Sequence, residues 1–374
     1  MMHEEQTVKV VQCTDYAEFA YEIYGDLTRE TWIRGIFIFI YVIIFVAGIT
    51  GNSCVIISVA RKASLQSVRN LFIVSLSCSD IVVCLTSVPI TPITVMRKNW
   101  IFGLPLCYIF PLLQCMSTII STFTLMAIAI DRFILIVYPT KQPLQKRHAV
   151  AMIVSIWTLA IGISIPMLLH YNLYKIPYEH RANHTVWYCG YFCDETWPNV
   201  EARQIYGGAV LVLQFIIPLI VITFCYGSIF LRVIKGVSMR QTTDHSLLPM
   251  NGTPSEAMVA RQKAIVRRRQ RTNRMLISMV AVFVACWFLQ VLLNVLRDFG
   301  AIPSPIADQP YLFSLIVHCI AMTSTLWNPV LYAWLNESFR KAFFEILPCV
   351  RVFCCAKRPQ INDFSLYRAG SVGE

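Results

Sequence analysis

The sequence has 374 residues, of which 56% are hydrophobic and only 14% are charged. A soluble protein of this length carries more charge and less apolar surface, so the composition indicates an integral membrane protein. The net charge of +11 does not indicate nucleic-acid binding, because the basic residues are concentrated in short segments between apolar runs.

Seven apolar runs are each long enough to cross a bilayer as a helix, the structure that satisfies every backbone polar group in lipid. They lie at about Ile36–Val59, Leu71–Val95, Leu106–Val137, Ala149–Leu169, Ile205–Ile234, Met275–Val295 and Leu312–Leu335. We therefore predict an all-α membrane protein, a seven-transmembrane helix bundle. No internal repeat is visible, which counts against many secondary transporters.

The charges between the runs predict the orientation. The segment before the first run is acidic, whereas the loop between the fifth and sixth runs is strongly basic, so the positive-inside rule places this loop in the cytoplasm and the N-terminus outside. We predict a flexible extracellular tail over residues 1–32, a transmembrane domain over 33–335 with its third intracellular loop at about 235–272, and a cytoplasmic tail over 336–374. The basic stretch from Arg261 to Arg274 is expected to extend the sixth helix.

The cytoplasmic tail begins with an amphipathic pattern, which predicts a short helix on the membrane surface. Its apolar positions are Phe339, Phe343, Phe344 and Ile346, and its charged positions are Arg340, Lys341 and Glu345.

The third run has no charged residue from Leu106 to Ile130 and ends on Asp131 and Arg132. Helix rise places Gln114 roughly 27 Å from Arg132, close to the thickness of a bilayer. One helix thus carries a polar group near the outer face and an acid–base pair at the inner face. Asp131 is expected to hold Arg132 until the arginine is freed to contact a partner. The alternative is an ordinary interfacial charge pair.

Asp80 is the one acid deep within a run, where an unpaired carboxylate costs roughly 2.5–3.5 kcal/mol. Asn52, Ser121 and Asn328 fall at similar depths, which suggests a cation site for sodium. The alternative is a protonated Asp80 in a hydrogen-bond network.

Four prolines interrupt apolar runs, and each removes a backbone hydrogen bond and allows a kink. They are Pro89, Pro166, Pro218 and Pro329. Asn328, Pro329 and Tyr332 at the end of the seventh run suggest a hinge with a mobile phenol. Trp287 in the sixth run is either part of a switch or a core-filling aromatic.

Other chemistry is sparse. The sequence has no metal-spaced His/Cys cluster, no Gly-rich phosphate loop and no Ser/His/Asp constellation at one depth, so we predict that it is not an enzyme. Asn183 begins a glycosylation sequon in an outer loop. Four cysteines fall outside, where disulfides persist: Cys13, Cys107, Cys189 and Cys193.

In combination, these motifs resemble the rhodopsin-type (class A) G-protein-coupled receptors. The order, spacing and membrane side all agree for Gly51-Asn52, Leu76–Asp80, Trp100, Cys107, Asp131-Arg132-Phe133, Trp157, Pro218, Tyr226, Cys286-Trp287 and Asn328–Tyr332. Within the class, the chain resembles the neuropeptide Y/neuropeptide F receptors at Gln114–Ser117, Cys193–Pro198, Asp298 and His318–Thr325.

The resemblance implies a binding site for a peptide that ends in an amidated Arg-aromatic sequence. Asp298 would pair with the ligand's arginine, and Thr91, Gln114 and His318 would surround the C-terminal amide. The alternatives are a solvated loop charge for Asp298, beside Arg297, and a packed core histidine for His318. Gln114 stands where amine receptors place an Asp, and the seventh run lacks the lysine that opsins need.

The resemblance also implies a Cys107–Cys193 disulfide, which leaves Cys189 free or joined to Cys13, and palmitoylation at Cys349. It further implies an activation relay through the Asp80 network, with members Asp131, Arg132, Tyr226, Trp287, Asn328, Pro329 and Tyr332. One departure concerns the sixth helix, because Leu289 stands where the family usually has a proline.

The function implied by the resemblance is a plasma-membrane receptor, N-terminus outside, that transmits peptide binding to heterotrimeric G proteins of the Gi/o type. Arrestin, receptor kinases and membrane lipids would be further partners. Sodium would be a bound allosteric ion, and no other cofactor is expected. A receptor for another peptide family, a constitutively active orphan receptor and an ion- or proton-coupled transporter remain as alternatives.

Overall fold

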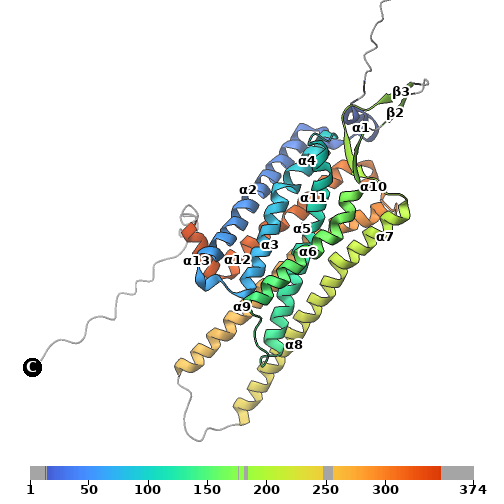
Figure 1. The fold of residues 1–374 in the computed structure, drawn as a ribbon. Helices are drawn as coiled ribbons and strands as arrows, with labels where there is room; N and C mark the ends of the chain where they lie inside the picture. The colour runs from blue at the N-terminus through green and yellow to red at the C-terminus, as the bar shows by residue number, and fades with distance from the viewer. Residues whose placement is uncertain (1–12, 14, 176, 181–183, 247–255, 347–374) are drawn as a thin grey trace, which may run out of the picture.

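The computed structural model describes residues 13, 15–175, 177–180, 184–246 and 256–346 as a bundle of long helices (Figure 1). Within this part of the chain, seven helical spans are long and apolar enough to cross a membrane, which confirms the predicted fold class. In chain order they are α2 (Thr31–Arg61), α3 (Val68–Leu85) with α4 (Ser87–Arg97), α5 (Gly103–Val137), α6 (Lys146–His170), α7 (Val200–Leu211) with the π-helical η3 (Val212–Ile216) and α8 (Ile217–Ser246), α9 (Glu256–Asp298), and α11 (Pro310–Met322) with α12 (Ser324–Leu335).

Three of the seven spans change their helical geometry midway, and one change is explained by a proline. Pro218 has no backbone N–H to donate to the carbonyl of Gln214, and the π turn η3 lies directly before it. The second span is interrupted at Thr86 and the seventh at Thr323. In contrast, α9 runs through Leu289 without interruption.

The first and seventh spans are joined around Pro329. This proline cannot donate a hydrogen bond to the carbonyl of Thr325, and the Asn52 side chain donates to that carbonyl instead, at 3.0 Å. Gly51 allows the close approach, because a Cβ at this position would lie 2.9 Å from the Pro329 ring. Asn52 therefore supplies the hydrogen bond that Pro329 cannot make, and Gly51 leaves room for the proline ring.

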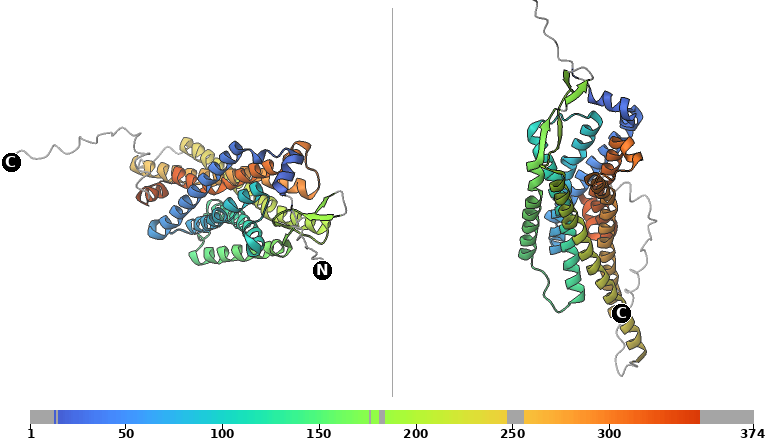
Figure 2. Two further views of the ribbon diagram at one scale, coloured as in Figure 1. Left: turned by 90° about the horizontal axis from the view of Figure 1, so that it is seen from above. Right: turned by 90° about the vertical axis from the view of Figure 1, so that its right-hand side faces the viewer.

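The outer end of the bundle, which we predicted to be extracellular, is covered by short elements of several segments (Figure 2). They are α1 (Tyr16–Tyr24), the 3-10 helix η1 (Leu27–Arg29), α10 (Ser304–Asp308) and two antiparallel pairs, β1 (Tyr171–Tyr174) with β4 (Phe192–Glu195) and β2 (Pro177–His180) with β3 (His184–Trp187).

The described residues 15–30 of the predicted tail are attached to the bundle. Two disulfides hold this end of the molecule, and they join Cys107 to Cys193, as expected, and Cys13 to Cys189. A buried ion pair between Asp26 and Lys98 adds a second attachment of the N-terminal segment to the bundle. The acidic composition alone did not reveal these long-range contacts.

The inner end has the predicted surface helix, α13 (Glu337–Ile346), and a 3-10 turn, η2 (Ala63–Leu65). Phe339 of α13 is fully buried and lies 5.5 Å from the Tyr332 ring, and Lys62 pairs with Glu345 at 2.7 Å. The third inner loop was predicted at about 235–272, but α8 continues into it to Ser246 and α9 begins within it at Glu256. Both helices project beyond the rest of the bundle (Figure 1).

Candidate functional site

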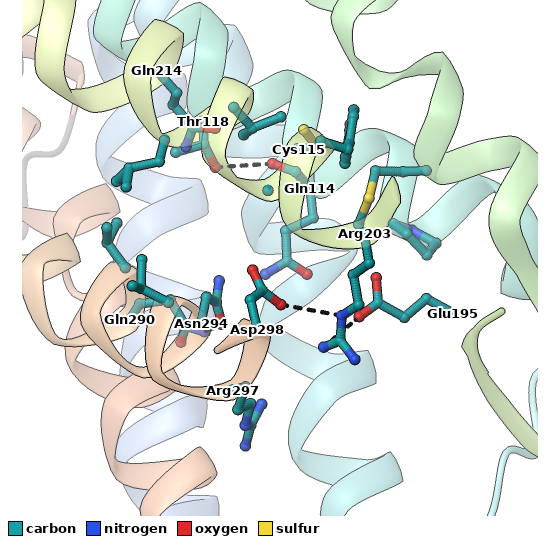
Figure 3. A pocket seen from close by; sticks show the side chains of 18 of the residues that line it. Gln114, Cys115, Thr118, Glu195, Arg203, Gln214, Gln290, Asn294, Arg297 and Asp298 are labelled. Atoms are coloured by element: carbon teal, nitrogen blue, oxygen red, sulfur yellow. Dashed lines mark hydrogen bonds and ion pairs between the residues drawn. The ribbon is translucent and has the colours of Figure 1, made fainter. Parts of the chain in front are cut away.

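A cavity of about 590 Å³ lies in the outer half of the bundle, between helices of the third, fifth and sixth spans. Its walls come from α5, α7, η3 and α9, and the strand β4 contributes to its rim. The volume is within the range of roughly 300–1,000 Å³ that is typical of small-ligand sites. Figure 3 shows the polar side chains that surround it.

The inner part of the cavity is lined by neutral amides and a hydroxyl. These are Gln114, Thr118, Gln214, Gln290 and Asn294. The sixth span contributes Trp287, Gln290 and Asn294 to one face, because helix neighbours are three and four residues apart. Nε2 of Gln290 donates to Oδ1 of Asn294 at 3.1 Å, but Oε1 of Gln290 is buried without a hydrogen-bond partner among the described residues. The amide surface therefore has hydrogen-bonding capacity left for a ligand.

Charged side chains line the outer part of the cavity. Three carboxylates face two guanidinium groups: Asp194, Glu195 and Asp298 against Arg203 and Arg297. Nη2 of Arg203 lies 2.7 Å from Oε1 of Glu195, and its Nε lies 3.1 Å from Oδ1 of Asp298. Arg297 donates to the Ser314 hydroxyl at 2.5 Å. The rim thus carries one negative charge in excess.

Tyr171, at the start of β1, also lines the cavity. Burial raises the pKa of its hydroxyl above the ordinary value, and the nearby carboxylates Glu195 and Asp194 act in the same direction. This phenol is therefore neutral at physiological pH and is able to donate a hydrogen bond.

The structure separates the four predicted ligand residues. Gln114 and Asp298 line the same cavity, whereas Thr91 and His318 are not among its lining residues. His318 is buried in the bundle, with Nδ1 2.8 Å from the Tyr41 hydroxyl and Nε2 2.9 Å from the Ser87 hydroxyl. Both ring nitrogens are thus occupied within the protein, so this geometry matches the alternative of a hydrogen-bonded core histidine.

Arg203 was missed as a site residue from the sequence. It lies in the first turn of α7, which is capped by the side chain of Asn199. A signal was present, because Arg203 is the one lysine or arginine between Arg181 and Arg232 and lies directly before the fifth run. Its pairing with Asp298 depends on the packing of two helices that are far apart in sequence.

The residues predicted for sodium make two separate hydrogen-bonded contacts deeper in the bundle. Oδ2 of the buried Asp80 accepts a hydrogen bond from Asn328 at 2.9 Å, and the Ser121 hydroxyl lies 3.3 Å from that of Ser79. Oδ1 of Asn52 and the Ser117 hydroxyl are buried without a partner in the described part of the chain. The side chains of Asp80, Ser121 and Asn328 carry oxygen atoms, the ligand type that a hard cation prefers.

The proposed relay residues extend from the cavity, which Trp287 lines, to the inner face. The Trp287 indole donates to Ser324 at 3.2 Å, and the Tyr332 hydroxyl is buried without a hydrogen-bond partner among the described residues. At the end of α5, Arg132 is paired with the neighbouring Asp131. Tyr226 lies on α8, half-buried against the core. The Asp131–Arg132 pair fits both interpretations of the sequence, a held arginine and an ordinary interfacial charge pair.

Two further predictions fall outside the described residues. They are glycosylation at Asn183 and palmitoylation at Cys349.

Comparison with known proteins agrees with this architecture. Residues 51–332 match the model of the family described as 7 transmembrane receptor (rhodopsin family), which covers more than half of the chain. The protein therefore belongs to the rhodopsin family of seven-transmembrane receptors. This membership confirms the predicted class and the prediction that the chain is not an enzyme.

Among its relatives is the neuropeptide receptor npr-1 of Caenorhabditis elegans, 33% identical over 86% of this chain and 74% of that receptor. The neuropeptide F receptor of Drosophila melanogaster is 31% identical over 82% of this chain and 61% of its own length. The neuropeptide Y receptor type 6 of Mus musculus is 32% identical, with 82% and 79% covered. The predicted resemblance to neuropeptide Y/F receptors is confirmed.

Proposed function

We propose that this receptor binds a neuropeptide that ends in an amidated Arg-aromatic sequence. The observation that carries the proposal is the division of one cavity into an acidic rim at Asp298 and an amide-lined interior at Gln114. By helix rise, Asp298 lies roughly 16 Å outward of Trp287, which leaves room for a terminal dipeptide between them. A cationic side chain at the rim and a neutral carboxamide inside complement these two surfaces.

The names of the relatives support the ligand class. The three receptors compared above are named as neuropeptide, neuropeptide F and neuropeptide Y receptors, and a further relative in Rattus norvegicus is a neuropeptide FF receptor, 32% identical over 89% of this chain. Thr91 and His318 would act indirectly, because neither lines the cavity and the hydrogen bonds of His318 join the first, second and seventh spans.

On the inner side, the proposal is coupling to heterotrimeric G proteins of the Gi/o type, with arrestin and receptor kinases as later partners. Arg132 is the residue that would be released from Asp131 to meet the G protein. The receptor would lie in the plasma membrane with its N-terminus outside. Sodium bound by Asp80, Ser121 and Asn328 would supply a positive charge beside the buried carboxylate.

The test is the response of cells expressing the full chain to synthetic peptides that end in Arg-Phe-amide or Arg-Tyr-amide, compared with their free acids. Inhibition of cAMP production reports the response. Removing one partner of a desolvated charge pair costs 2–5 kcal/mol, so Asp298→Ala should lower potency by roughly 30-fold or more.

The matched control is Asp308→Ala, which removes the same charge from an exposed position in α10 outside the cavity lining. It should leave potency unchanged at equal surface expression. Unchanged potency of Asp298→Ala would remove this residue from the binding site, and equal potency of amides and acids would refute the amide preference.

A further inference from the structure

Arg203 occupies the position in which a ligand's arginine is expected. Its guanidinium lies between Glu195 and Asp298, at 2.7 and 3.1 Å, on the rim of the cavity (Figure 3). Asp298 is the carboxylate that we propose for the ligand. In the structure this carboxylate therefore already has a guanidinium partner, which comes from the protein itself.

Both acidic residues also make contacts that do not involve Arg203. Oε2 of Glu195 accepts a hydrogen bond from the Trp197 indole at 2.9 Å. The backbone carbonyl of Asp298 accepts from Gln204 at 2.8 Å. The Asp298 side chain also lies close against the backbone of α7, since a Cβ at Gly207 would be only 2.6 Å from its Oδ2. The acidic site would thus persist if Arg203 moved away.

The Arg203 side of its ion pair with Asp298 is partly exposed and lacks a well-aligned hydrogen bond. The Arg203 side chain is 37% exposed, against 17% for Asp298 and 20% for Glu195. Its Nε lies within ion-pair distance of Asp298 but makes no hydrogen bond of good geometry. Ion pairs with this degree of exposure contribute little to stability, so the guanidinium is able to leave at small cost.

We propose that Arg203 is an internal competitor of the ligand: it pairs with Asp298 in the free receptor and gives up this carboxylate when the ligand's arginine binds. This inference rests on the proposed function, because it requires a ligand with a guanidinium group. The rim has three carboxylates and two guanidiniums, so an incoming arginine balances the charges while Arg203 keeps Glu195. A neutral ligand residue gains no charge pairing at Asp298 and would leave Arg203 in place, so the competition acts on a cationic ligand only.

The experiment compares two peptides on the full-length receptor, one ending in Arg-Phe-amide and one in which citrulline, a neutral analogue of nearly the same shape, replaces the arginine. The variant is Arg203→Gln, which keeps polar length but removes the competing charge. The matched control is Arg297→Gln, because this second rim arginine bonds to Ser314 rather than to Asp298. Potency is measured at equal surface expression for each peptide and receptor.

Arg203→Gln should increase the potency of the arginine peptide by about two- to fivefold, the value of one partly exposed ion pair. The citrulline peptide should change by less than about twofold, and Arg297→Gln should alter the ratio of the two potencies less than Arg203→Gln does. In the Asp298→Asn background the gain from Arg203→Gln should disappear, since the contested carboxylate is no longer charged.

Two failures are distinguishable. A wild-type receptor that responds equally to both peptides, or to neither, overturns the proposed function and the competition with it. A wild-type receptor that prefers the arginine peptide, combined with an Arg203→Gln variant of equal or lower potency, overturns the competition alone and makes Arg203 a positioning residue for Asp298. Equal effects of Arg203→Gln and Arg297→Gln would also overturn it, because they indicate a general charge effect.

Discussion

Lys98→Met tests the attachment of the N-terminal segment to the bundle. The Lys98 side chain is 1% exposed and that of its partner Asp26 is 2% exposed. The Lys98 ammonium also donates to the Thr28 hydroxyl at 3.1 Å and lies 4.5 Å from the centre of the Tyr311 ring. Methionine preserves most of the side-chain volume, so the change mainly removes the charge and leaves Asp26 buried without its cation.

Breaking a buried pair by removing one partner costs about 3–5 kcal/mol, because the remaining charge is uncompensated. Asp26 is also bonded to the backbone N–H and hydroxyl of Thr28, at 3.1 and 2.7 Å, so it stays fixed in the folded segment. The free energy for opening residues 15–30 should fall by a similar amount. A fall of 3 kcal/mol corresponds to ~150-fold faster hydrogen exchange in this segment.

The assay is hydrogen–deuterium exchange of residues 15–30 in the purified receptor. Lys62→Met is the matched control: it breaks the pair with Glu345, whose side chains are 30% and 63% exposed, and should cost less than about 1 kcal/mol. The double variant Asp26→Leu/Lys98→Met should recover part of the loss, because neither charge then remains buried. Exchange in Lys98→Met that equals the wild type, or a double variant as fast as the single, would refute the reasoning.

Two further predictions concern other long-range contacts. Asn52→Leu should lower the free energy of unfolding by about 1–3 kcal/mol, because the Thr325 carbonyl loses its donor, and should lower the thermal midpoint by roughly 5 °C. The control Gln66→Leu removes an exposed donor and should have little effect. Equal midpoints for the two variants would contradict this prediction. Cys189→Ser should accelerate hydrogen exchange in α1, and Cys13→Ser should match it, because both break the same disulfide. Different exchange rates in these two variants would show that the bond is not what holds α1.

Three kinds of contact fix the N-terminal segment to the outer end of the bundle. The N-terminal segment is attached to the second outer loop by Cys13–Cys189 and to α4 by Asp26–Lys98. Its ring cluster includes Tyr16, 4.9 Å from the Tyr188 ring. The described cavity lies instead among the third, fifth and sixth spans. A peptide terminus that enters this cavity would therefore bind away from His318, which is bonded to the first and second spans.

Local chemistry determined much of this protein from the sequence alone. Seven apolar runs specify seven spans because lipid leaves the backbone no partner other than its own helix. The amphipathic spacing after Asn336 specified α13, and the surface exposure of its charged side is a direct result of that spacing. The Asp131–Arg132 pair also needed no tertiary information, since the two residues are neighbours in the chain.

Only the tertiary structure decided which distant groups meet. It paired Asp298 with Arg203, placed His318 between Tyr41 and Ser87, and joined Cys13 to Cys189. Each of these contacts depends on the rotation and depth of separate helices or on the path of an outer segment. Hydrophobic periodicity states which residues are buried but not which partner they face, and for a charged or polar group inside a bundle the partner determines its role.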